Sequence, residues 1–384
     1  MAKTFDVIII GAGSIGTPAA FYLAEAGLKT LVLDAYPSVG QGANKAAIGG
    51  IRATHSDIAK IRVGLKSLEI LSTWKETYGD EIEWYQGGYS FVAYREREER
   101  ILKDLLRVQT EHGLNIRWLN RDDLLRAVPG LNPDGLLGGT LSPDDGNVSP
   151  LLLNHAFYRH AGERGAVFRF SEKVTEILVA GGKVRGVKTD AGAYSAPIVI
   201  NAAGGAAREV ARLAGVDVPV NPDSHEAGVT EPVARFLQPM VVDIRPAPGS
   251  ANYYFYQHTT GQVIFCVTPD PPMVGTDRRE TSDFLPLITR RMVDLMPKLA
   301  NLKVRRTWRG LYPMSPDGSP LVGWSREAEG FLQAVGMCGQ GLMLGPGLGV
   351  YLVKLVKGEL TAEDREIFAI FSPDRKFGAV EKLK

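Results

Sequence analysis

Three glycines and an aspartate near the start of the chain have the spacing of a dinucleotide site. Gly11, Gly13 and Gly16 lie in the stretch GAGSIG, and Asp34 follows eighteen residues after the last of them. The first glycine permits a tight turn, the second lets the backbone approach a pyrophosphate, and the third lets a helix pack closely against a strand. The pyrophosphate then meets N–H groups at the helix N-terminus, and Asp34 can accept a hydrogen bond from a ribose hydroxyl.

The flanking residues predict the strands and the helix that such a motif needs. Residues 7–10 are a continuous β-branched run, which is typical of a parallel strand buried on both faces. Residues 15–26 are small and apolar at helical spacing, and residues 28–33 predict a second strand that ends at Asp34. The motif therefore lies in a strand–helix–strand unit, although on its own it does not distinguish NAD from FAD.

The rest of the chain alternates between helical and extended patterns without repeats or flexible linkers. We expect strands at 81–93, a helix at 95–112, a turn-rich crossing at 132–150, a helix at 150–165, paired strands at 167–178 and 183–189, a second strand–glycine–helix unit at 195–215, a hairpin at 253–267, a helix at 283–299, and a glycine-rich loop that leads into an apolar helix after residue 336.

Composition excludes several classes of function. The chain has 384 residues, with 44 Lys and Arg against 43 Asp and Glu, and no basic stripe that would favour nucleic acid. Its two cysteines, Cys266 and Cys338, give neither a disulfide framework nor metal-ligand spacing, which favours a reducing compartment. The first strand leaves no room for a signal peptide, and no apolar run reaches about 18 residues. We therefore expect a cytoplasmic protein without a bound metal or a membrane span.

Several motifs occur in the order shown by one family of flavoenzymes. They are GAGSIG, VINAAGG, GVTEP, WRGLYPMSPDGSPLVG and GMCGQGLMLGPGLG. With them the whole chain resembles the FAD-dependent D-amino-acid oxidase superfamily, and most closely the β subunits of dye-linked L-proline dehydrogenase and heteromeric sarcosine oxidase. The resemblance implies an α/β fold with a Rossmann-like FAD-binding domain (1–80, 145–220 and 305–384). It also implies a substrate-binding domain (81–144 and 221–304) built on a mixed or antiparallel β-sheet.

The resemblance also implies which residues bind the FAD. Most relatives have glutamate where Asp34 stands, and Val174 has plain strand packing as an equal alternative. Gly310 stands where monomeric sarcosine oxidases carry the cysteine that tethers FAD, so noncovalent FAD is expected. The implied cofactor-binding residues are Gly11, Gly13, Ser14, Ile15, Gly16, Asp34, Ala35, Gln41, Ala43, Asn44, Val174, Ala203, Gly204, Gly310, Gly339, Gln340, Gly341, Leu342 and Met343.

Arg52 falls where sarcosine-oxidase-like enzymes place an arginine that pairs with the substrate carboxylate. A planar guanidinium can hold a carboxylate through two parallel hydrogen bonds and so fix the α-carbon over the flavin. The alternative is a loop arginine that is paired with Asp57 or exposed to solvent. Arg309 is a further candidate anion ligand, with a structural role as its alternative.

Aromatic residues of the predicted hairpin complete the implied site. Family analogy places Tyr253, Tyr254, Tyr256 and His258 across the pocket from the flavin, with Tyr253 first among them, although alternating aromatics there also suit a plain core. His225 has a counterpart in β subunits of the proline-dehydrogenase type, but a structural histidine is the preferred interpretation.

The implied chemistry is loss of a hydride from a neutral amine to flavin N5, which gives an imine. The second domain would bind a small imino or N-alkyl amino acid, L-proline first and sarcosine second. In monomeric sarcosine oxidases a lysine beside the flavin promotes the reaction with oxygen. The matching residues 251–272 contain no lysine here, and Met343 replaces a second lysine of those oxidases, so oxygen is not the expected electron acceptor. The alternatives are an oxidase of glycine, sarcosine or D-amino acids that releases hydrogen peroxide, a nicotinamide-dependent dehydrogenase, and an electron-relay or assembly subunit.

The expected partners follow from the same resemblance. Relatives of the proline-dehydrogenase type work beside a second flavin or iron–sulfur subunit, and the tail at 372–384 looks too polar to add to a core alone. A hetero-oligomer or a homo-oligomer is therefore expected.

Overall fold

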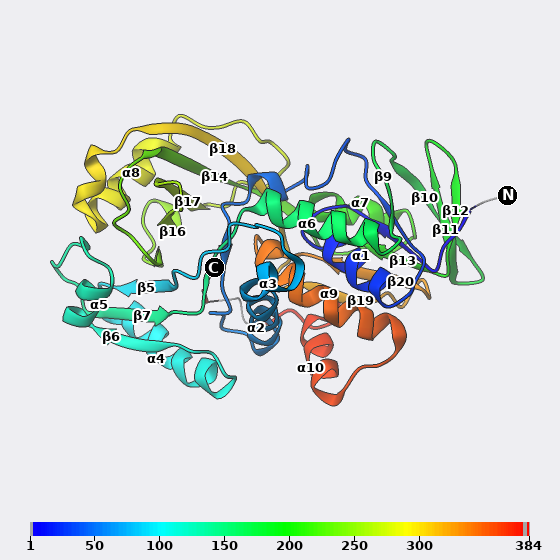
Figure 1. Ribbon diagram of the computed structural model, residues 1–384, viewed down its shortest axis with the longest axis horizontal. Coiled ribbons are helices and arrows are strands. Elements are labelled where there is room, and N and C mark those ends of the chain that lie inside the picture. Colours follow the sequence, from blue (N-terminus) through cyan, green and yellow to red (C-terminus); the bar gives the residue numbers. More distant parts are fainter. Residues whose placement is uncertain (1–2, 379–381, 384) are drawn as a thin grey trace.

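A computed structural model describes residues 3–378 and 382–383. One half of the molecule, on the right in Figure 1, is built on a six-stranded sheet. Adjacent strands of this sheet run parallel except at one edge, where β19 is antiparallel to β20. Across the sheet the strands are β19 (Leu321–Trp324), β20 (Phe331–Val335), β13 (Ile198–Asn201), β2 (Val7–Ile10), β3 (Thr30–Leu33) and β9 (Val167–Arg169).

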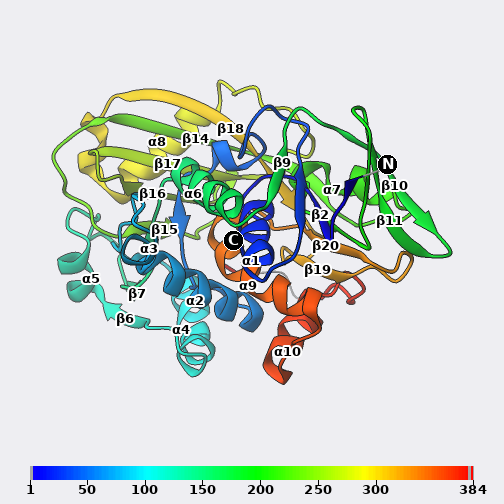
Figure 2. The same cartoon turned by 45° about the vertical axis from the view of Figure 1, so that its right-hand side comes forward.

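Both faces of this sheet are covered. The alternation of strand side chains sends Val7 and Ile9 into the core beneath the helices, while Ile8 and Ile10 point to the other face. In Figure 2, α1 lies beside α9, and it also contacts α6. The helices on this side are α1 (Gly16–Glu25), α2 (Ile58–Ser72), α3 (Trp74–Tyr78), α6 (Pro150–Glu163), α9 (Gly341–Lys357) and α10 (Ala362–Phe371).

A small four-stranded sheet and one short helix pack on the opposite face. Side chains of this sheet and of α7 (Ala207–Arg212) share a core with Ile8 and Ile10. The predicted burial of residues 7–10 on both faces is thereby confirmed. The strands of the small sheet are, in order, β1 (Lys3–Thr4), β12 (Ala193–Ser195), β11 (Lys183–Thr189) and β10 (Val174–Ala180).

The other half of the molecule is built on an eight-stranded mixed sheet. Adjacent strands of this sheet are antiparallel, except that β15 and β5 run parallel to each other. The predicted α/β fold with a second domain on a mixed sheet is therefore confirmed. Across the sheet the strands are β18 (Val304–Met314), β14 (Asn221–Pro232), β17 (Gln262–Asp270), β16 (Gly249–Gln257), β15 (Met240–Asp243), β5 (Tyr89–Ala93), β7 (Gly138–Ser142) and β6 (Arg117–Asn120).

Helices cover both faces of the eight-stranded sheet as well. One face packs against α8 (Phe284–Leu295) and α5 (Arg121–Ala127), and the other packs against α4 (Glu96–Glu111). The remaining elements are the two-stranded sheet of β4 (Gly50–Ile51) and β8 (Gly146–Asn147) and the short 3-10 helices η1 (Asn44–Ala46), η2 (Gly204–Ala206) and η3 (Pro297–Asn301).

The predicted domain boundary at residue 305 falls inside β18. This strand pairs with β14 from Val304 to Met314, so residues 305–314 belong to the eight-stranded sheet rather than to the dinucleotide-binding half. The division of the chain into two discontinuous domains otherwise stays a prediction.

The local patterns did not predict every element. The stretch predicted as a turn-rich crossing contains β7, and α2 and α10 were not predicted. Strand β7 begins with Gly138 and Gly139, which are poor strand formers, but the sheet requires a small residue there. A Cβ on Gly139 would lie 2.5 Å from the carbonyl oxygen of Phe91 on the neighbouring strand. Tertiary pairing therefore overrides the local preference.

The tail contributes more to the structure than its composition suggests. Arg375 forms an ion pair with Asp317, with a shortest N–O distance of 2.7 Å, and its guanidinium also donates to the carbonyl oxygens of Ser319 and Pro320. Leu383 is only 1 % exposed and packs in a hydrophobic cluster, so this residue of the tail adds to the core although the stretch as a whole is polar. Residues 379–381 and 384 of the predicted tail lie outside the described residues.

Among residues 3–378 and 382–383, no helix is both long enough and apolar enough to cross a membrane.

Candidate active site

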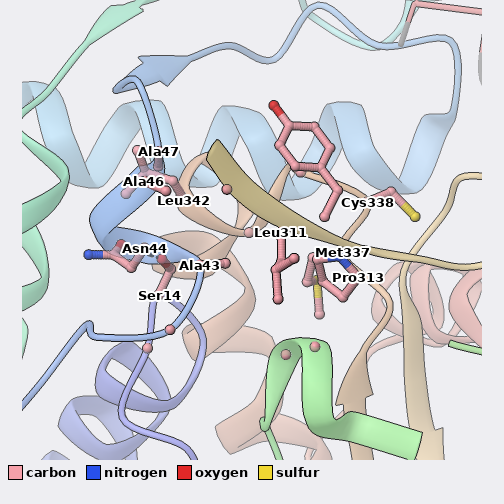
Figure 3. A pocket seen from close by; sticks show the side chains of 18 of the residues that line it. Ser14, Ala43, Asn44, Ala46, Ala47, Leu311, Pro313, Met337, Cys338 and Leu342 are labelled. Atoms are coloured by element: carbon pink, nitrogen blue, oxygen red, sulfur yellow. Dashed lines mark hydrogen bonds between the residues drawn. The ribbon is translucent and has the colours of Figure 1, made fainter. Parts of the chain in front are cut away.

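A cavity of about 990 Å³ is lined by residues from both large sheets. Its walls come from the loop after β2, from η1 and β4, from the turn after β13, from the start of α9 and from one face of the eight-stranded sheet. In the view of Figure 3, Ser14 and Asn44 lie on one side of this space and Leu311 and Pro313 lie on the other. The cavity therefore joins the dinucleotide motif to the second sheet.

The three glycines of the motif occupy different environments. Gly11 has a φ of +112°, and a Cβ there would lie 2.4 Å from the carbonyl oxygen of Ala202. A Cβ on Gly16 would lie 1.8 Å from the carbonyl oxygen of Gly11, so this glycine lets α1 pack on the end of β2 and does not line the cavity. Gly13 lines the cavity, and a Cβ there would meet no heavy atom within 4 Å. A ligand can therefore approach the backbone at Gly13.

Asp34 lies at the end of β3, at the edge of the cavity. Its Oδ2 accepts from the backbone N–H of Ala12 at 2.7 Å, and its Oδ1 accepts from that of Tyr36 at 2.8 Å. Burial raises the pKa of this carboxyl, and the two N–H groups partly offset the rise. Each carboxylate oxygen has a second lone pair, so both can still accept a hydroxyl.

A side-chain pair joins the loop after β2 to η1. The Ser14 hydroxyl donates to Asn44 Oδ1 at 2.5 Å, and Asn44 Nδ2 donates to the carbonyl oxygen of Pro150 at 3.0 Å. Asn44 is buried, and both residues line the cavity. Gln41, in contrast, receives a hydrogen bond from Lys45 and is not among the lining residues.

The glycine-rich segment that runs into the start of α9 forms the opposite wall. A Cβ on Gly345 would lie 1.9 Å from the carbonyl oxygen of Ser14, so glycine lets α9 pack on the dinucleotide loop. Gly339 has a φ of +81° and lies directly against the ring of Tyr312. Gln340 is buried, and its Oε1 has no hydrogen-bond partner in the described part of the chain. Gln340 is one of the residues that line the cavity.

Most of the predicted cofactor residues line this one cavity, and Val174 is among them although it is also packed in a strand. Gly16 and Gln41 are the two that do not. Those that do are Gly11, Gly13, Ser14, Ile15, Asp34, Ala35, Ala43, Asn44, Val174, Ala203, Gly204, Gly310, Gly339, Gln340, Gly341, Leu342 and Met343.

Strand alternation separates the predicted hairpin tyrosines. Tyr254 lines the cavity, whereas Tyr253 points to the opposite face of β16, where its hydroxyl donates to the carbonyl oxygen of Arg291 at 2.8 Å. Tyr256 shares the face of Tyr254, but its hydroxyl donates to the carbonyl oxygen of Ile48 at 2.5 Å. His258 does not line the cavity either. The structure thus brings Tyr254 to the site in place of the preferred Tyr253.

Tyr254 belongs to a buried polar cluster. Its hydroxyl lies 2.8 Å from that of Tyr312, and burial raises the pKa of both phenols well above the usual value. The ring of Tyr312 stacks on His225 at a centroid distance of 3.7 Å, and His225 Nε2 lies 3.5 Å from Asp223 Oδ2. Asp223, His225, Tyr254 and Tyr312 all line the cavity. The phenols stay protonated at neutral pH; one O–H is used in the bond between them, so the other can donate a hydrogen bond to a ligand.

Arg52 directly follows β4, lines the cavity and is 7 % exposed. Its Nη1 donates to the carbonyl oxygen of Thr54 and lies 3.2 Å from His55 Nδ1, and its Nη2 donates to the carbonyl oxygen of Leu383 at 2.5 Å. The guanidinium lies over the ring of Phe91 at 5.6 Å. A buried cation therefore borders the cavity.

The two predicted arginines, Arg52 and Arg309, lie in different surroundings. Asp57, considered as a partner of Arg52, caps helix α2 by accepting from the backbone N–H of Lys60. Arg309 does not line the cavity: its Nη1 donates to the carbonyl oxygen of Arg279 at 2.9 Å, and its Nη2 lies 3.0 Å from Met273 Sδ. Of the two arginines, the structure brings Arg52 to the cavity.

Several lining residues were missed from the sequence. Tyr89, Phe91 and Val242 form the apolar wall near Arg52, and Tyr312 lies opposite the glycine loop. Tyr89 and Phe91 are two residues apart on a strand, and this period of two is the signal that they share a face. Nothing in the sequence says that this face is the one that borders the cavity.

Asp145 holds the loop that carries Arg52. Its Oδ1 accepts from the backbone N–H of Ala53 at 2.8 Å, and its Oδ2 accepts from the Thr54 hydroxyl at 2.6 Å. Burial raises the pKa of Asp145 to about 7, with the hydrogen bonds from Thr54 and Ala53 and the charge of Arg52 acting against the rise. No sequence pattern indicates this role, because Asp145 lies in a turn-rich stretch with other acidic residues.

We expect Asp145 to make stability depend on pH. In the unfolded chain this carboxyl titrates near pH 4, so between about pH 4 and pH 7 the folded protein binds more protons than the unfolded chain. The free energy of unfolding should therefore fall as pH rises through this window, by about 4 kcal/mol, and should level off above it. Asp145→Asn should remove that fall, as urea unfolding of both proteins at pH 4.5, 6 and 8 can measure. An equal slope in the two proteins would contradict this role.

A dinucleotide cradle at the carboxyl ends of parallel strands, opening onto a second sheet with a buried arginine, is the arrangement of a dinucleotide-dependent oxidoreductase. The family model described as FAD dependent oxidoreductase matches residues 6–355, and the chain belongs to this family. The nicotinamide-dependent alternative is thereby excluded.

Individual relatives cover the whole chain at low identity. Hydrogen cyanide synthase subunit HcnC of Pseudomonas aeruginosa is 27% identical over 420 residues, covering 97% of this chain and 98% of the relative. The crystal structure of L-proline dehydrogenase from P. horikoshii matches with a TM-score of 0.89 at 27% identity, over 97% of this chain and 98% of that one. Glycine oxidase from Geobacillus kaustophilus matches with a TM-score of 0.86 at 25% identity, over 98% and 100%.

The residues of the cavity fit FAD. The backbone at Gly13 is open to a pyrophosphate, Asp34 has lone pairs for a ribose, and the lining residue Gln340 holds a buried amide oxygen without a hydrogen-bond partner in the described part of the chain. Gly339 to Met343 lead into α9, whose first residues have no side-chain cap. Their N–H groups would lie beside the negative charge that a flavin acquires when it is reduced.

Proposed function

We propose that this protein is an FAD-dependent amine dehydrogenase that oxidises a small imino or N-alkyl amino acid, L-proline or a sarcosine-like compound, and passes the electrons to an acceptor other than oxygen. The observation that carries the proposal is a single cavity that joins the dinucleotide cradle to the buried Arg52. Bound FAD would supply the hydride acceptor, which no protein side chain can replace.

The protein residues would orient the substrate and exclude water. Arg52 would hold the carboxylate through a two-bond fork, and the Tyr254 hydroxyl, paired with Tyr312, would offer a further donor. Tyr89 and Phe91 form an apolar wall beside Arg52, which suits the ring of proline or an N-methyl group. An apolar wall also favours the neutral amine over the ammonium, because burial disfavours the charged form.

The names of the relatives support the substrate class. L-proline dehydrogenase and glycine oxidase are both named for an amino acid, and they match over nearly the whole chain. HcnC is named as a subunit of a synthase. This supports a hetero-oligomer, and by the resemblance to proline dehydrogenases the partner would be a second flavin or iron–sulfur subunit. A homo-oligomer is the alternative, which light scattering on the purified chain can separate from it.

The substrate is tested by mixing the purified yellow protein anaerobically with L-proline, sarcosine, glycine and D-alanine in turn. The proposal expects bleaching of the flavin first with L-proline or sarcosine, and bleaching by none of the four would refute it. An oxidase that acts on glycine is the second candidate, favoured by the match to glycine oxidase.

We expect slow reoxidation of the substrate-reduced protein in air. A positive charge beside a flavin stabilises the superoxide formed in the first one-electron step, and neither segment that carries a lysine in monomeric sarcosine oxidases has one here. The colour should return slowly in air and quickly with a dye or quinone, as stopped-flow absorbance can measure. Rapid return with stoichiometric hydrogen peroxide would make the protein an oxidase instead.

We also expect the FAD to be noncovalent. Gly310 lines the cavity at the place where a tethering cysteine would stand, with its Cα close to Ala46. Cys338 also lines the cavity, but its Sγ lies 3.3 Å from the backbone N of Ser315 and 3.1 Å from the carbonyl oxygen of Gly336, so protein groups already engage it. Acid precipitation should leave a colourless pellet and a yellow supernatant. A yellow pellet would show a covalent bond.

A further inference from the structure

The contacts of Arg52 leave part of its guanidinium available. A guanidinium carries five N–H donors, and three of these face Thr54 O, His55 Nδ1 and Leu383 O. The two that remain, Nε–H and one N–H of Nη2, are on neighbouring nitrogens and have no partner among the described residues. Neighbouring N–H groups of this kind form a two-bond fork with a carboxylate.

Leu383 is the contact that fixes the Nη2 end of this group. It lies 331 residues from Arg52 in sequence, yet its carbonyl oxygen lies 2.5 Å from Nη2. Its side chain is buried in a cluster with Tyr89, Phe91 and Val242, which also line the cavity. Leu383 therefore packs against the apolar wall of the cavity that lies near Arg52.

Backbone contacts hold the segment in this place. The backbone N–H of Lys382 donates to the Ser56 hydroxyl at 3.3 Å, in the loop that also carries Arg52. The segment and the arginine loop are therefore joined at two points, Ser56 and Arg52. A change that displaced Leu383 would free the Nη2 end of the guanidinium to rotate.

We propose that Leu383 is a positioning residue for Arg52: its main-chain carbonyl, held by the burial of its side chain, aims the two free donors of Arg52 at the carboxylate of a ligand in the cavity. This inference rests on the proposed function for the identity of the substrate, but not for the binding of a carboxylate. Residues near the end of the chain thereby become part of the substrate site.

The test uses Leu383→Asp, which places a charge in the apolar cluster, together with Leu383→Met and Leu383→Ala in the full chain. Leu137→Asp is the matched control, because Leu137 is 37 % exposed and lies outside the cavity. Propanoate and its neutral analogue propanamide are titrated into each FAD-loaded protein and followed by the flavin absorbance. KM and kcat for L-proline are measured with a dye acceptor.

Leu383→Asp is expected to raise the Kd of propanoate and the KM roughly 10- to 100-fold, the typical range for losing the alignment of one charged hydrogen bond. The Kd of propanamide and the FAD content should not change. The control Leu137→Asp and the conservative Leu383→Met should both keep the wild-type Kd of propanoate and the wild-type KM. In an Arg52→Ala background Leu383→Asp should have no further effect. If Leu383→Asp does not fold, Leu383→Ala replaces it in the test, and a smaller rise in the Kd of propanoate and in the KM is expected.

Two results would overturn the inference. An unchanged Kd for propanoate in a folded Leu383→Asp protein would show that the segment does not position Arg52. Tighter binding would show that Leu383 competes with the ligand for Arg52. A protein that binds propanoate as expected but oxidises none of the amino acids would refute the proposed function and leave this inference intact.

Discussion

Arg52→Ala should lower kcat/KM for L-proline by about 2–4 kcal/mol of transition-state binding, or roughly 30- to 900-fold. Arg52 is buried beside the cavity, so its pairing with a carboxylate would be largely desolvated. Arg52→Lys should not restore the activity, because an ammonium cannot form the two-bond fork. Steady-state kinetics with a dye acceptor measure the loss.

The same substitution removes the donor from two buried carbonyl oxygens, those of Thr54 and Leu383. FAD content and the thermal midpoint must therefore be measured beside the kinetics, since unpaired acceptors cost stability. Arg309→Ala is the matched control, because Arg309 is a half-buried arginine outside the cavity, and kcat/KM should stay within about threefold. Unchanged kcat/KM in an Arg52→Ala protein with full FAD would end its role as the carboxylate ligand.

Gly16→Ala and Gly13→Ala should damage the dinucleotide loop in different ways. At Gly16 a methyl group would lie 1.8 Å from the carbonyl oxygen of Gly11, so α1 would have to move away from β2. We expect a loss of about 3 kcal/mol or more in the free energy of unfolding, at the upper end of what overpacking costs. At Gly13 the methyl group meets no protein atom, so the folded protein should keep its stability.

Gly13→Ala should weaken the binding of the cofactor instead. Its methyl group would project into the space where a pyrophosphate approaches the backbone, so FAD should bind roughly 10- to 100-fold more weakly. Thermal unfolding of the FAD-free proteins and fluorescence titration with FAD separate the two effects. A Gly13→Ala protein with unchanged FAD affinity, or a Gly16→Ala protein with unchanged stability, would contradict the roles assigned to these glycines.

The sequence by itself determined the strand–helix–strand unit of the dinucleotide motif. A β-branched run, three spaced glycines and a carboxylate at the next strand end are local patterns, and each acts within about thirty residues. The strand at Val7–Ile10 and the helix at Gly16–Glu25 lie where these patterns predict them. The family motifs extended the prediction to the glycine-rich segment at the start of α9, where residues 339–343 line the same cavity.

Only the tertiary structure decided the substrate half. Alternation on β16 says that Tyr253 and Tyr254 face opposite sides, but the pairing of β16 with β15 and β17 decides which side borders the cavity. Likewise, local sequence cannot separate Arg52 from Arg309, because the neighbours of an arginine do not show whether its side chain reaches the cavity.

The contact between Arg52 and Leu383 shows the physical reason most clearly. It joins residues 331 positions apart, and its donor and acceptor come from a loop and from the tail rather than from a periodic element. Periodicity reports which residues of one helix or strand share a face, because that follows from the geometry of a single element. Which side chains from distant elements meet at a site depends on how the two sheets and the tail pack together, and no local pattern in this chain encodes that.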